Sequence, residues 1–190
     1  MKPVKRLYLS TDETHVADVN LVLELNSCGR GFITAQTDQD YTGKMVRLDV
    51  GYSGQLLRWF TGYVERAQPA EKGFMRLFVR ELAGVFDRAW PCSFQHPTLR
   101  DVAAWLTENS GITVSVPDAS YSRTPIPHFT HSGTGFQLLS NLGKAFGIND
   151  YVWYQLPDGS MYAGGAEAAL FAGRPVEIPH EFSQGAAGGN

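Results

Sequence analysis

Two histidines three residues apart, His128 and His131, are the residues whose type and spacing come nearest to a metal site in this sequence. Paired imidazoles can begin the coordination sphere of zinc or nickel. However, no glutamate lies between them, no third ligand follows, and an odd offset within a strand would put the two rings on opposite faces. We therefore predict that the chain binds no metal.

A nucleophile, a histidine and an acid can also be chosen from the sequence. The nucleophile would be Ser132 or Cys92, the base His131 or His96, and the acid Asp150. Neither the G-x-S-x-G elbow of serine hydrolases nor a cysteine-protease context surrounds them. We predict no catalytic residue among them.

Carboxylate pairs and glycine-rich segments give no stronger signal. Glu108 falls on the polar side of a predicted helix and Asp118 follows a proline, so they are no pair for glycoside cleavage. No lysine follows in Walker spacing after the clustered glycines, which are Gly133, Gly135, Gly143 and Gly147. The sequence thus predicts no cofactor site and a protein that is not an enzyme.

An aromatic run at residues 151–154, Tyr-Val-Trp-Tyr, offers a different function. Exposed aromatic rings can stack on sugars, so a cell-wall-binding or carbohydrate-binding module is the alternative to a structural role. Alternating aromatic residues in a strand more often form one core face and one contact face.

Charge argues against nucleic acid and membrane as partners. The chain has 16 Lys and Arg against 19 Asp and Glu, a formal net charge of -3. Arg76 and Arg80 interleave with Phe74 and Phe78, but this pattern is typical of a half-buried strand rather than of a phosphate-binding groove. Charged residues make up 18% of the chain, below the roughly 25% of average domains. A surface with so few charges favours a protein that is part of an assembly.

The cysteines and the N-terminus indicate a cytosolic site of synthesis. Cys28 and Cys92 form no CxxC pair, so we expect two free thiols in a reducing compartment. The basic start is followed by a polar break at residues 10–13 and does not resemble a signal peptide. No window approaches the roughly 18 apolar residues of a membrane span.

The segment 98–165 predicts two helices, each followed by a strand. Both helices have a threonine N-cap, an acidic or amide side chain three positions later, and a closing glycine. These residues are Thr98, Asp101 and Gly111 in the first helix, and Thr134, Gln137 and Gly147 in the second. The buried stripes are predicted at Leu99, Val102, Ala103 and Leu106, and at Leu138, Leu139, Leu142, Ala145 and Phe146. The second strand runs into a turn at 157–160.

The first half of the chain predicts antiparallel β structure. Val19, Leu21, Leu23 and Leu25 alternate with other residues in a period of two. A turn or bulge is expected at 27–31 and a polar loop at 67–73. The predicted strands are 19–26, 32–36, 45–52, 56–64 and 74–80. Strands at this spacing without an intervening helix favour a small barrel or sandwich.

These segments carry a resemblance to a known family. The motifs are Phe-Thr-Gly-Tyr-Val at 60–64, the capped starts at 98–103 and 135–139, and the strand and turn at 153–159. Over about residues 19–178, the chain resembles the hub proteins of phage tails and contractile injection systems. That superfamily includes late control D proteins, Mu-like baseplate hubs and the N-terminal region of VgrG-like proteins.

The resemblance implies an α+β fold, with an N-terminal antiparallel β barrel or sandwich followed by a small α/β domain with two helices. We expect a barrel-like hub domain at 1–90, an α/β domain at 91–165, and a strand-like segment with a flexible Gly/Ala tail at 166–190. The implied function is that of a structural tail protein, a hub or baseplate component connecting tail tube to spike. Its partners would be itself, as a homo-oligomer with a trimer as the candidate state, and the tube and spike proteins. It would reside in the virion tail after assembly in the bacterial cytoplasm.

The resemblance implies that in this family the α/β domain is inserted between two barrels, and the sequence departs from that pattern after residue 165. Only one strand-like stretch follows, Pro-Val-Glu-Ile-Pro at 175–179, and a single strand cannot form the family's second barrel. Either the hub is reduced, or the chain is an N-terminal part of a longer hub whose Gly/Ala tail is a linker.

The candidate interface is the strand around residue 59. Residues 56–60, Leu-Leu-Arg-Trp-Phe, are apolar on both faces of a predicted strand, whereas an isolated barrel buries only one. We expect Trp59, Phe60 and Tyr63 to lie in or just beneath a contact with another subunit or tail protein.

Overall fold

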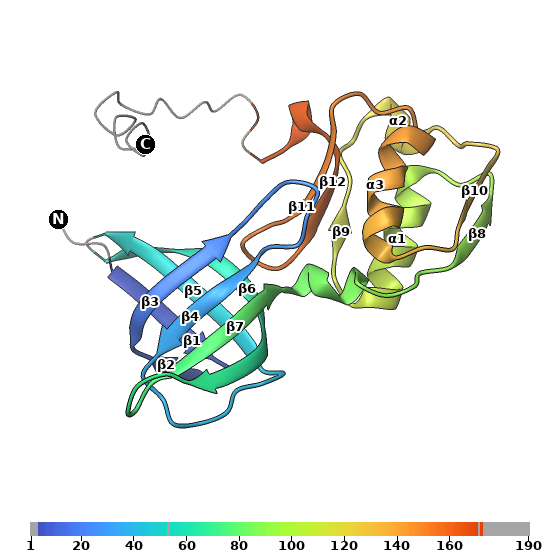
Figure 1. Ribbon diagram of the computed structural model, residues 1–190. Coiled ribbons are helices and arrows are strands. Elements are labelled where there is room, and N and C mark those ends of the chain that lie inside the picture. The colour runs from blue at the N-terminus through green and yellow to red at the C-terminus, as the bar shows by residue number, and fades with distance from the viewer. Residues whose placement is uncertain (1–3, 53, 171, 173–190) are drawn as a thin grey trace, which may run out of the picture.

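The computed structural model, drawn as a ribbon in Figure 1, describes residues 4–52, 54–170 and 172. Its buried apolar side chains form two hydrophobic cores. A curled antiparallel sheet surrounds the first core, and helices and smaller sheets surround the second. The predicted α+β class with an N-terminal barrel-like sheet is therefore confirmed. No helix among the described residues is long and apolar enough to cross a membrane.

The curled sheet has seven strands in the order β2-β1-β5-β6-β7-β4-β3, and all neighbouring strands are antiparallel. The strands are β1 (Val4–Leu9), β2 (Asp12–Thr14), β3 (Val16–Val22), β4 (Arg30–Ala35), β5 (Met45–Tyr52), β6 (Gln55–Pro69) and β7 (Met75–Glu81). Its edge strands β2 and β3 are separated only by His15, so the chain itself joins the two edges. The sheet therefore curls into a barrel rather than remaining open.

Alternation of side chains fills this barrel. Leu7, Leu48 and Phe60 point inward from three adjacent strands and are at most 1% exposed. Ile33 and Leu77 face each other across β4 and β7 and close the core from the other side. The period of two in the sequence thus selects the buried face of each strand.

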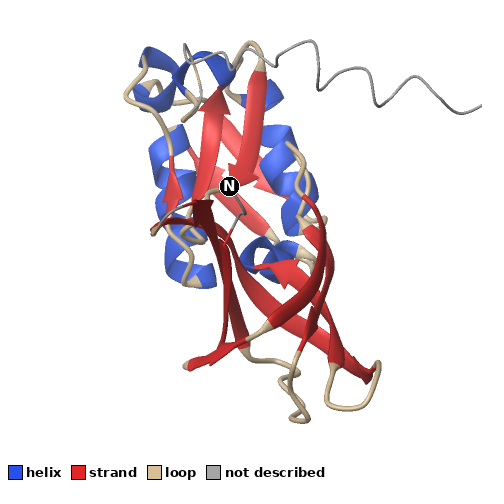
Figure 2. Cartoon of the chain, turned by 90° about the vertical axis from the view of Figure 1, so that its left-hand side faces the viewer, coloured by secondary structure: helices blue, strands red, loops and turns tan. Residues whose placement is uncertain are grey.

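The second half packs helices against short strands (Figure 2). Its elements are η1 (Leu82–Phe86), β8 (Cys92–Gln95), α1 (Leu99–Ser110), β9 (Val114–Ser115), α2 (Ser120–Arg123), β10 (His128–His131), α3 (Gly135–Ala145), β11 (Tyr151–Gln155), β12 (Met161–Gly165) and η2 (Ala166–Ala168). Strand β12 lies between antiparallel β11 and parallel β9, and β8 pairs with β10. We call residues 82–168 the helical half.

Both predicted helix starts are confirmed. Thr98 and Asp101 form a reciprocal capping box at α1, and Thr134 and Gln137 form one at α3. Gly111 ends α1 in the left-handed conformation, as predicted. Helix α3 ends at Ala145 with Phe146 as its C-cap, and the predicted glycine, Gly147, follows in the left-handed conformation.

Several sequence-based strand bounds are wrong. Strand β3 ends at Val22, because Leu23 and Leu25 leave the sheet and are 41% and 59% exposed. Strand β6 continues to Pro69 through residues predicted as loop, because β7 pairs with it there. Strand β1, which pairs with β5, was not predicted from the sequence. Its basic residues are exposed near its N-terminal end.

The helical half takes its core from both sides of the predicted domain boundary at 90/91. Ala83, Phe86 and Trp90 pack in the same cluster as Leu138 and Trp153. We keep the three-part division as a proposal, with η1 as the connection between the two cores. Of the predicted last part, residues 166–168 form η2, whereas the strand-like stretch at 175–179 and the Gly/Ala tail lie outside the described residues.

Candidate assembly interface

The three predicted interface residues occupy three different environments. Trp59 is 54% exposed, whereas Phe60 is 1% exposed and lies in the barrel core directly beneath it. Tyr63 is half-buried and lines a separate hollow with Leu82 and Val85. The structure therefore brings Trp59 and Phe60 together but places Tyr63 at another surface.

A β-bulge displays Trp59. Leu48 of β5 pairs with Phe60 and Asp49 pairs with Arg58, so Trp59 has no partner across the strand pair. An extra residue of this kind bends its strand and redirects a side chain. Arg58 forms an ion pair with Asp49 next to the bulge, and this pair fixes the strand beside the indole.

Trp59 forms part of a groove of about 560 Å³, which we call the apolar groove. The β3–β4 loop, strand β6, the end of β7, the β11–β12 hairpin and Leu170 line it. The lining residues are Leu23, Glu24, Leu25, Leu57, Arg58, Trp59, Phe60, Thr61, Glu81, Tyr154, Gln155, Leu156, Pro157 and Leu170. Figure 1 shows the β3–β4 loop rising beside the β11–β12 hairpin, between the barrel and the helices. The groove thus lies where the two halves meet.

One side of β6 is without a strand partner at this groove. Strand β6 pairs with β5 over residues 55–63, but its pairing with β7 begins only at Gly62. In the part of the chain that the structure describes, residues 55–61 pair with β5 alone. An unpaired strand edge is a template for another extended segment.

Buried amide and hydroxyl groups hold the walls of the groove in place. Gln155 is 8% exposed, and its side chain donates to the Thr61 carbonyl (2.7 Å) and accepts from the Ala83 N–H (2.9 Å). The Thr61 hydroxyl donates to the Pro157 carbonyl at 2.7 Å. These bonds tie the hairpin to the barrel, so the groove is a built feature rather than a gap between independent parts.

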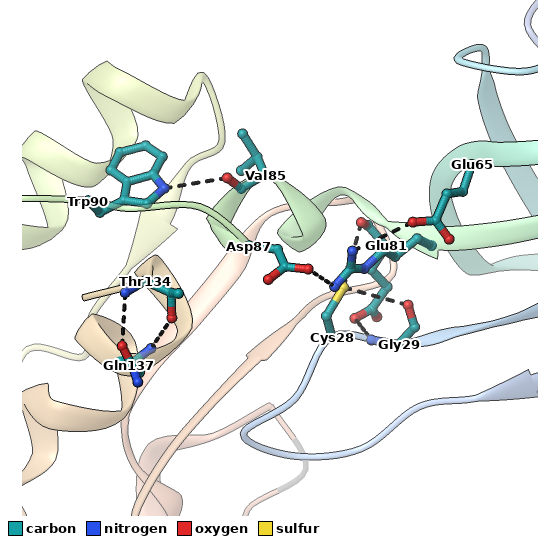
Figure 3. A network of polar contacts seen from close by, with 10 residues as sticks. Cys28, Gly29, Glu65, Glu81, Val85, Asp87, Trp90, Thr134 and Gln137 are labelled. Atoms are coloured by element: carbon teal, nitrogen blue, oxygen red, sulfur yellow. Dashed lines mark hydrogen bonds and ion pairs between the residues drawn. The ribbon is translucent and has the colours of Figure 1, made fainter.

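Glu81 is the buried acid of the groove. It is 7% exposed, and its Oε2 accepts the Gly29 N–H at 2.6 Å (Figure 3). Burial raises the pKa of its carboxyl to about 7, although the Gly29 hydrogen bond opposes this effect. The carboxyl thereby fastens the β3–β4 loop to the end of β7.

A second, polar hollow of about 920 Å³ lies around Arg80. Arg80 is paired with Asp87 at 2.8 Å and with Glu65 at 3.7 Å (Figure 3). The Cys28 thiol lies in this hollow, and burial raises its pKa to about 11. A protonated thiol is a poor nucleophile, so this hollow offers no activated cysteine.

The candidate catalytic residues come together only in part. Cys92 and His131 are direct partners across β8 and β10, which sequence spacing could not show. Burial raises the pKa of the Cys92 thiol, and the His131 ring bonds to the Thr134 carbonyl at 2.9 Å. The candidate acid Asp150 immediately precedes β11, and its backbone carbonyl accepts from the Ala166 N–H. A nucleophilic thiol needs a lowered pKa or an adjacent base. The pKa of the Cys92 thiol is raised instead, and the His131 ring is engaged by the Thr134 carbonyl.

The other polar candidates serve local structure. Asp118 pairs with Arg100 and Arg123, while Glu108 is exposed on α1. His128 is exposed at the start of β10. Among the described residues, no group of three or more His, Cys, Asp or Glu side chains could hold a metal ion.

Tyr151 and Trp153 of the aromatic run on β11 are turned inward and offer no stacking surface to a sugar, whereas Tyr154 lines the apolar groove. Trp153 is 1% exposed, stacks on Phe136 at 5.8 Å and donates to Ser140 Oγ at 3.1 Å. The Tyr151 hydroxyl donates to the Leu139 carbonyl at 2.7 Å. Packing of α3 against the strand covers both rings, so they are part of the core of the helical half.

The interleaved arginines of β7 also have local partners. The guanidinium of Arg76 lies 4.0 Å from the Phe32 ring centroid, and that of Arg66, on the neighbouring strand β6, lies 3.9 Å from the ring centroid of Phe78 on β7. Such cation–π contacts between adjacent strands stabilise the sheet surface. They do not form a row of free cations along this strand.

Comparisons with known proteins place this architecture in a class. No protein-family model matches the chain. Among solved structures, the 43 kDa tail protein of prophage MuSo2 from Shewanella oneidensis superposes with a TM-score of 0.61 at 16% identity, covering 84% of this chain and 53% of its own. A tail protein from Neisseria meningitidis MC58 gives 0.60 at 19% identity, covering 88% and 52%. The chain thus has the fold of phage tail proteins, which confirms the predicted resemblance at the level of the fold.

A phage protein is also similar in sequence. The chain is 44% identical over 183 residues to an uncharacterized 58.7 kDa protein in the lys 3′ region of Haemophilus phage HP1. The match covers 96% of this chain and 34% of the phage protein, so the chain spans about a third of the length of that relative.

Proposed function

We propose that this chain is a structural, non-enzymatic component of a phage or prophage-derived tail. The observation that carries the proposal is the fold it shares with two tail proteins over 84% and 88% of its length. The similarity to a protein of phage HP1 supports a phage origin. The raised pKa values of Cys28 and Cys92 fit a role that requires no nucleophile.

Within the tail, the finer role is that of a hub or baseplate protein that connects tail tube to spike. It would assemble in the bacterial cytoplasm and reside in the virion tail, as a homo-oligomer that also contacts the tube and spike proteins. The contact surface would centre on Trp59, with Phe60 supporting it from the core, because a bulge presents this indole to solvent. Tyr63 would join only a contact broad enough to reach its separate hollow.

Light scattering coupled to size-exclusion chromatography tests this role, with Trp59→Glu as the variant. We expect the wild-type chain to form an oligomer or to bind tube and spike proteins in a pull-down, and the variant to shift toward the monomer. Met45→Glu is the matched control, since Met45 is 45% exposed on the barrel but does not line the apolar groove. A wild-type chain that stays monomeric at high concentration and binds neither protein would contradict the proposal.

A further inference from the structure

The polar hollow around Arg80 contains a cation without a partner. Arg30 and Arg80 both line the hollow, and Asp87 is the one Asp or Glu among its described lining residues. Asp87 and Glu65 pair with Arg80 (Figure 3). Arg30 is exposed and forms no ion pair with any described residue. The guanidinium of Arg30 is therefore free to bind an anion.

Hydrogen-bonding groups from both halves of the molecule complete the lining. Ser27 belongs to the β3–β4 loop, whereas Ser132 and Asn141 belong to the helical half. Hydroxyl and amide groups beside an arginine are well suited to a carboxylate, because all of them can donate to its oxygens. A concave surface of one predominant charge also strengthens the local potential. The hollow is thus better suited to a carboxylate than to a cation.

The hollow is large enough for a turn of polypeptide. Its volume of about 920 Å³ lies at the upper end of the roughly 300–1,000 Å³ found for ligand pockets. The ligand class that fits both its size and its charge is an acidic loop of a protein.

This chain carries such a loop at residues 37–42, which we call the acidic loop. Asp38 and Asp40 are exposed on it. Tyr41 is 8% exposed, and its hydroxyl donates to a carboxylate of β2 at 3.0 Å, which anchors the loop to the barrel. Hydrogen bonds from Thr42 lower the pKa of the Asp40 carboxyl, so it remains ionised. The loop therefore presents two carboxylates in a turn that is held in place.

The acidic loop and the polar hollow lie at opposite ends of the barrel. Strand β4 begins at Arg30 in the hollow and ends at Ala35, two residues before the loop. A strand of this length spans about 17–20 Å. Figure 1 shows the loop after β4 at the end of the barrel that faces away from the helices. A chain cannot place its own acidic loop in its own hollow, so the loop must come from another molecule.

We propose that the polar hollow of one copy binds the acidic loop of a second copy, with Asp38 placed against Arg30. A second copy is the partner favoured here because both complementary charges belong to this chain. The two surfaces differ, so the contact is head-to-tail and closes a ring where the rotation between subunits allows it. The inference rests on the proposed function only in that both expect a homo-oligomer, and its contact is separate from the one at Trp59.

Sedimentation of the full 190-residue chain at low ionic strength tests the inference through exchange of charges. Arg30→Glu and Asp38→Lys should each weaken self-association at least about tenfold, because each replaces an attraction by a repulsion. A chain with both changes should associate more tightly than either single variant. Lys72→Glu and Glu108→Lys are the matched controls, since both residues are exposed and lie outside the hollow and the loop. Circular dichroism checks that every variant is folded.

Salt dependence provides a measurement that needs no variant. Raising the salt concentration from about 0.05 M to about 0.5 M should weaken the association of the wild-type chain, because exposed charges are screened. Self-association that salt leaves unchanged would contradict a charged contact.

The outcomes separate this inference from the proposed function. Self-association that neither Arg30→Glu nor Asp38→Lys changes would overturn the inference, while the contact at Trp59 would still be tested by Trp59→Glu. Loss of binding to tube or spike proteins in Arg30→Glu, with self-association unchanged, would show that another protein occupies the hollow and would overturn the assignment to a second copy. A monomeric wild-type chain that binds tube and spike proteins would overturn the inference and leave the tail role standing.

Discussion

The barrel and the helical half differ in how many of their large apolar side chains are exposed to solvent. Among the described residues, the barrel and its β3–β4 loop expose several large apolar side chains, which are Val4, Val22, Leu23, Leu25, Met45, Tyr52, Leu57 and Trp59. From η1 onward, Leu170 is the one described residue with an exposed large apolar side chain. The helical half has the larger aromatic content, yet its rings are buried or half-buried. The helical half therefore satisfies its own packing, and the barrel presents apolar surface that an assembly could cover.

The largest expected effect would test whether the helical half is as self-sufficient as its burial indicates. Trp153→Ala removes a ring that is 1% exposed, together with its bond to Ser140, and should destabilise the protein by about 3–5 kcal/mol. Urea unfolding followed by circular dichroism measures the change. A loss below about 1 kcal/mol would mean that this core is not closely packed.

Glu81 allows a test of how the β3–β4 loop is held against the end of β7. Its carboxyl has a folded-state pKa of about 7, above the ordinary 4.5, so the folded state binds the proton more tightly than the unfolded state. This contribution to stability is complete below pH 4.5 and is lost as pH rises through 7. Glu81→Gln keeps an acceptor for Gly29 and should raise stability at pH 8 by about 2–3 kcal/mol relative to wild type. Unfolding curves at pH 5 and 8 measure this, and an equal pH slope in the two proteins would contradict it.

Capping provides a smaller test within the helical half alone. Thr98→Ala and Thr134→Ala each remove one capping box and should each cost about 1 kcal/mol. The matched control is Thr124→Ala, because the Thr124 hydroxyl bonds to a carbonyl at the exposed end of short α2. Thermal unfolding should rank both cap variants below the control. Equal melting temperatures for all three variants would show that the caps add little.

The smallest effect on stability is expected at Trp59, which sharpens the contrast with Trp153. Trp59→Ala changes a side chain that is 54% exposed and should alter the unfolding free energy by only about 0.5 kcal/mol. The same unfolding experiment, run beside Trp153→Ala, provides the comparison. If the isolated chain loses several kcal/mol with Trp59→Ala, the indole already packs against something within the chain.

Local signals in the sequence determined the starts of the two long helices and most of the barrel strands. A threonine followed by Asp101 or Gln137 satisfies backbone N–H groups within one turn, so no distant residue is needed to place α1 or α3. The period of two likewise fixes which strand residues face inward, because alternation depends on the backbone alone. The capped helices and the strand-and-turn motif also carried the resemblance to phage tail proteins.

Tertiary pairing decided the features that matter for the candidate site. Strand β6 extends to Pro69 because β7 pairs with it, and Trp59 is exposed because β5 and β6 change register beside it. The meeting of Cys92 with His131, and the burial of Glu81 under the β3–β4 loop, join residues far apart in the chain. Pairing and burial of this kind depend on which segments meet in space, and local sequence patterns do not contain that information.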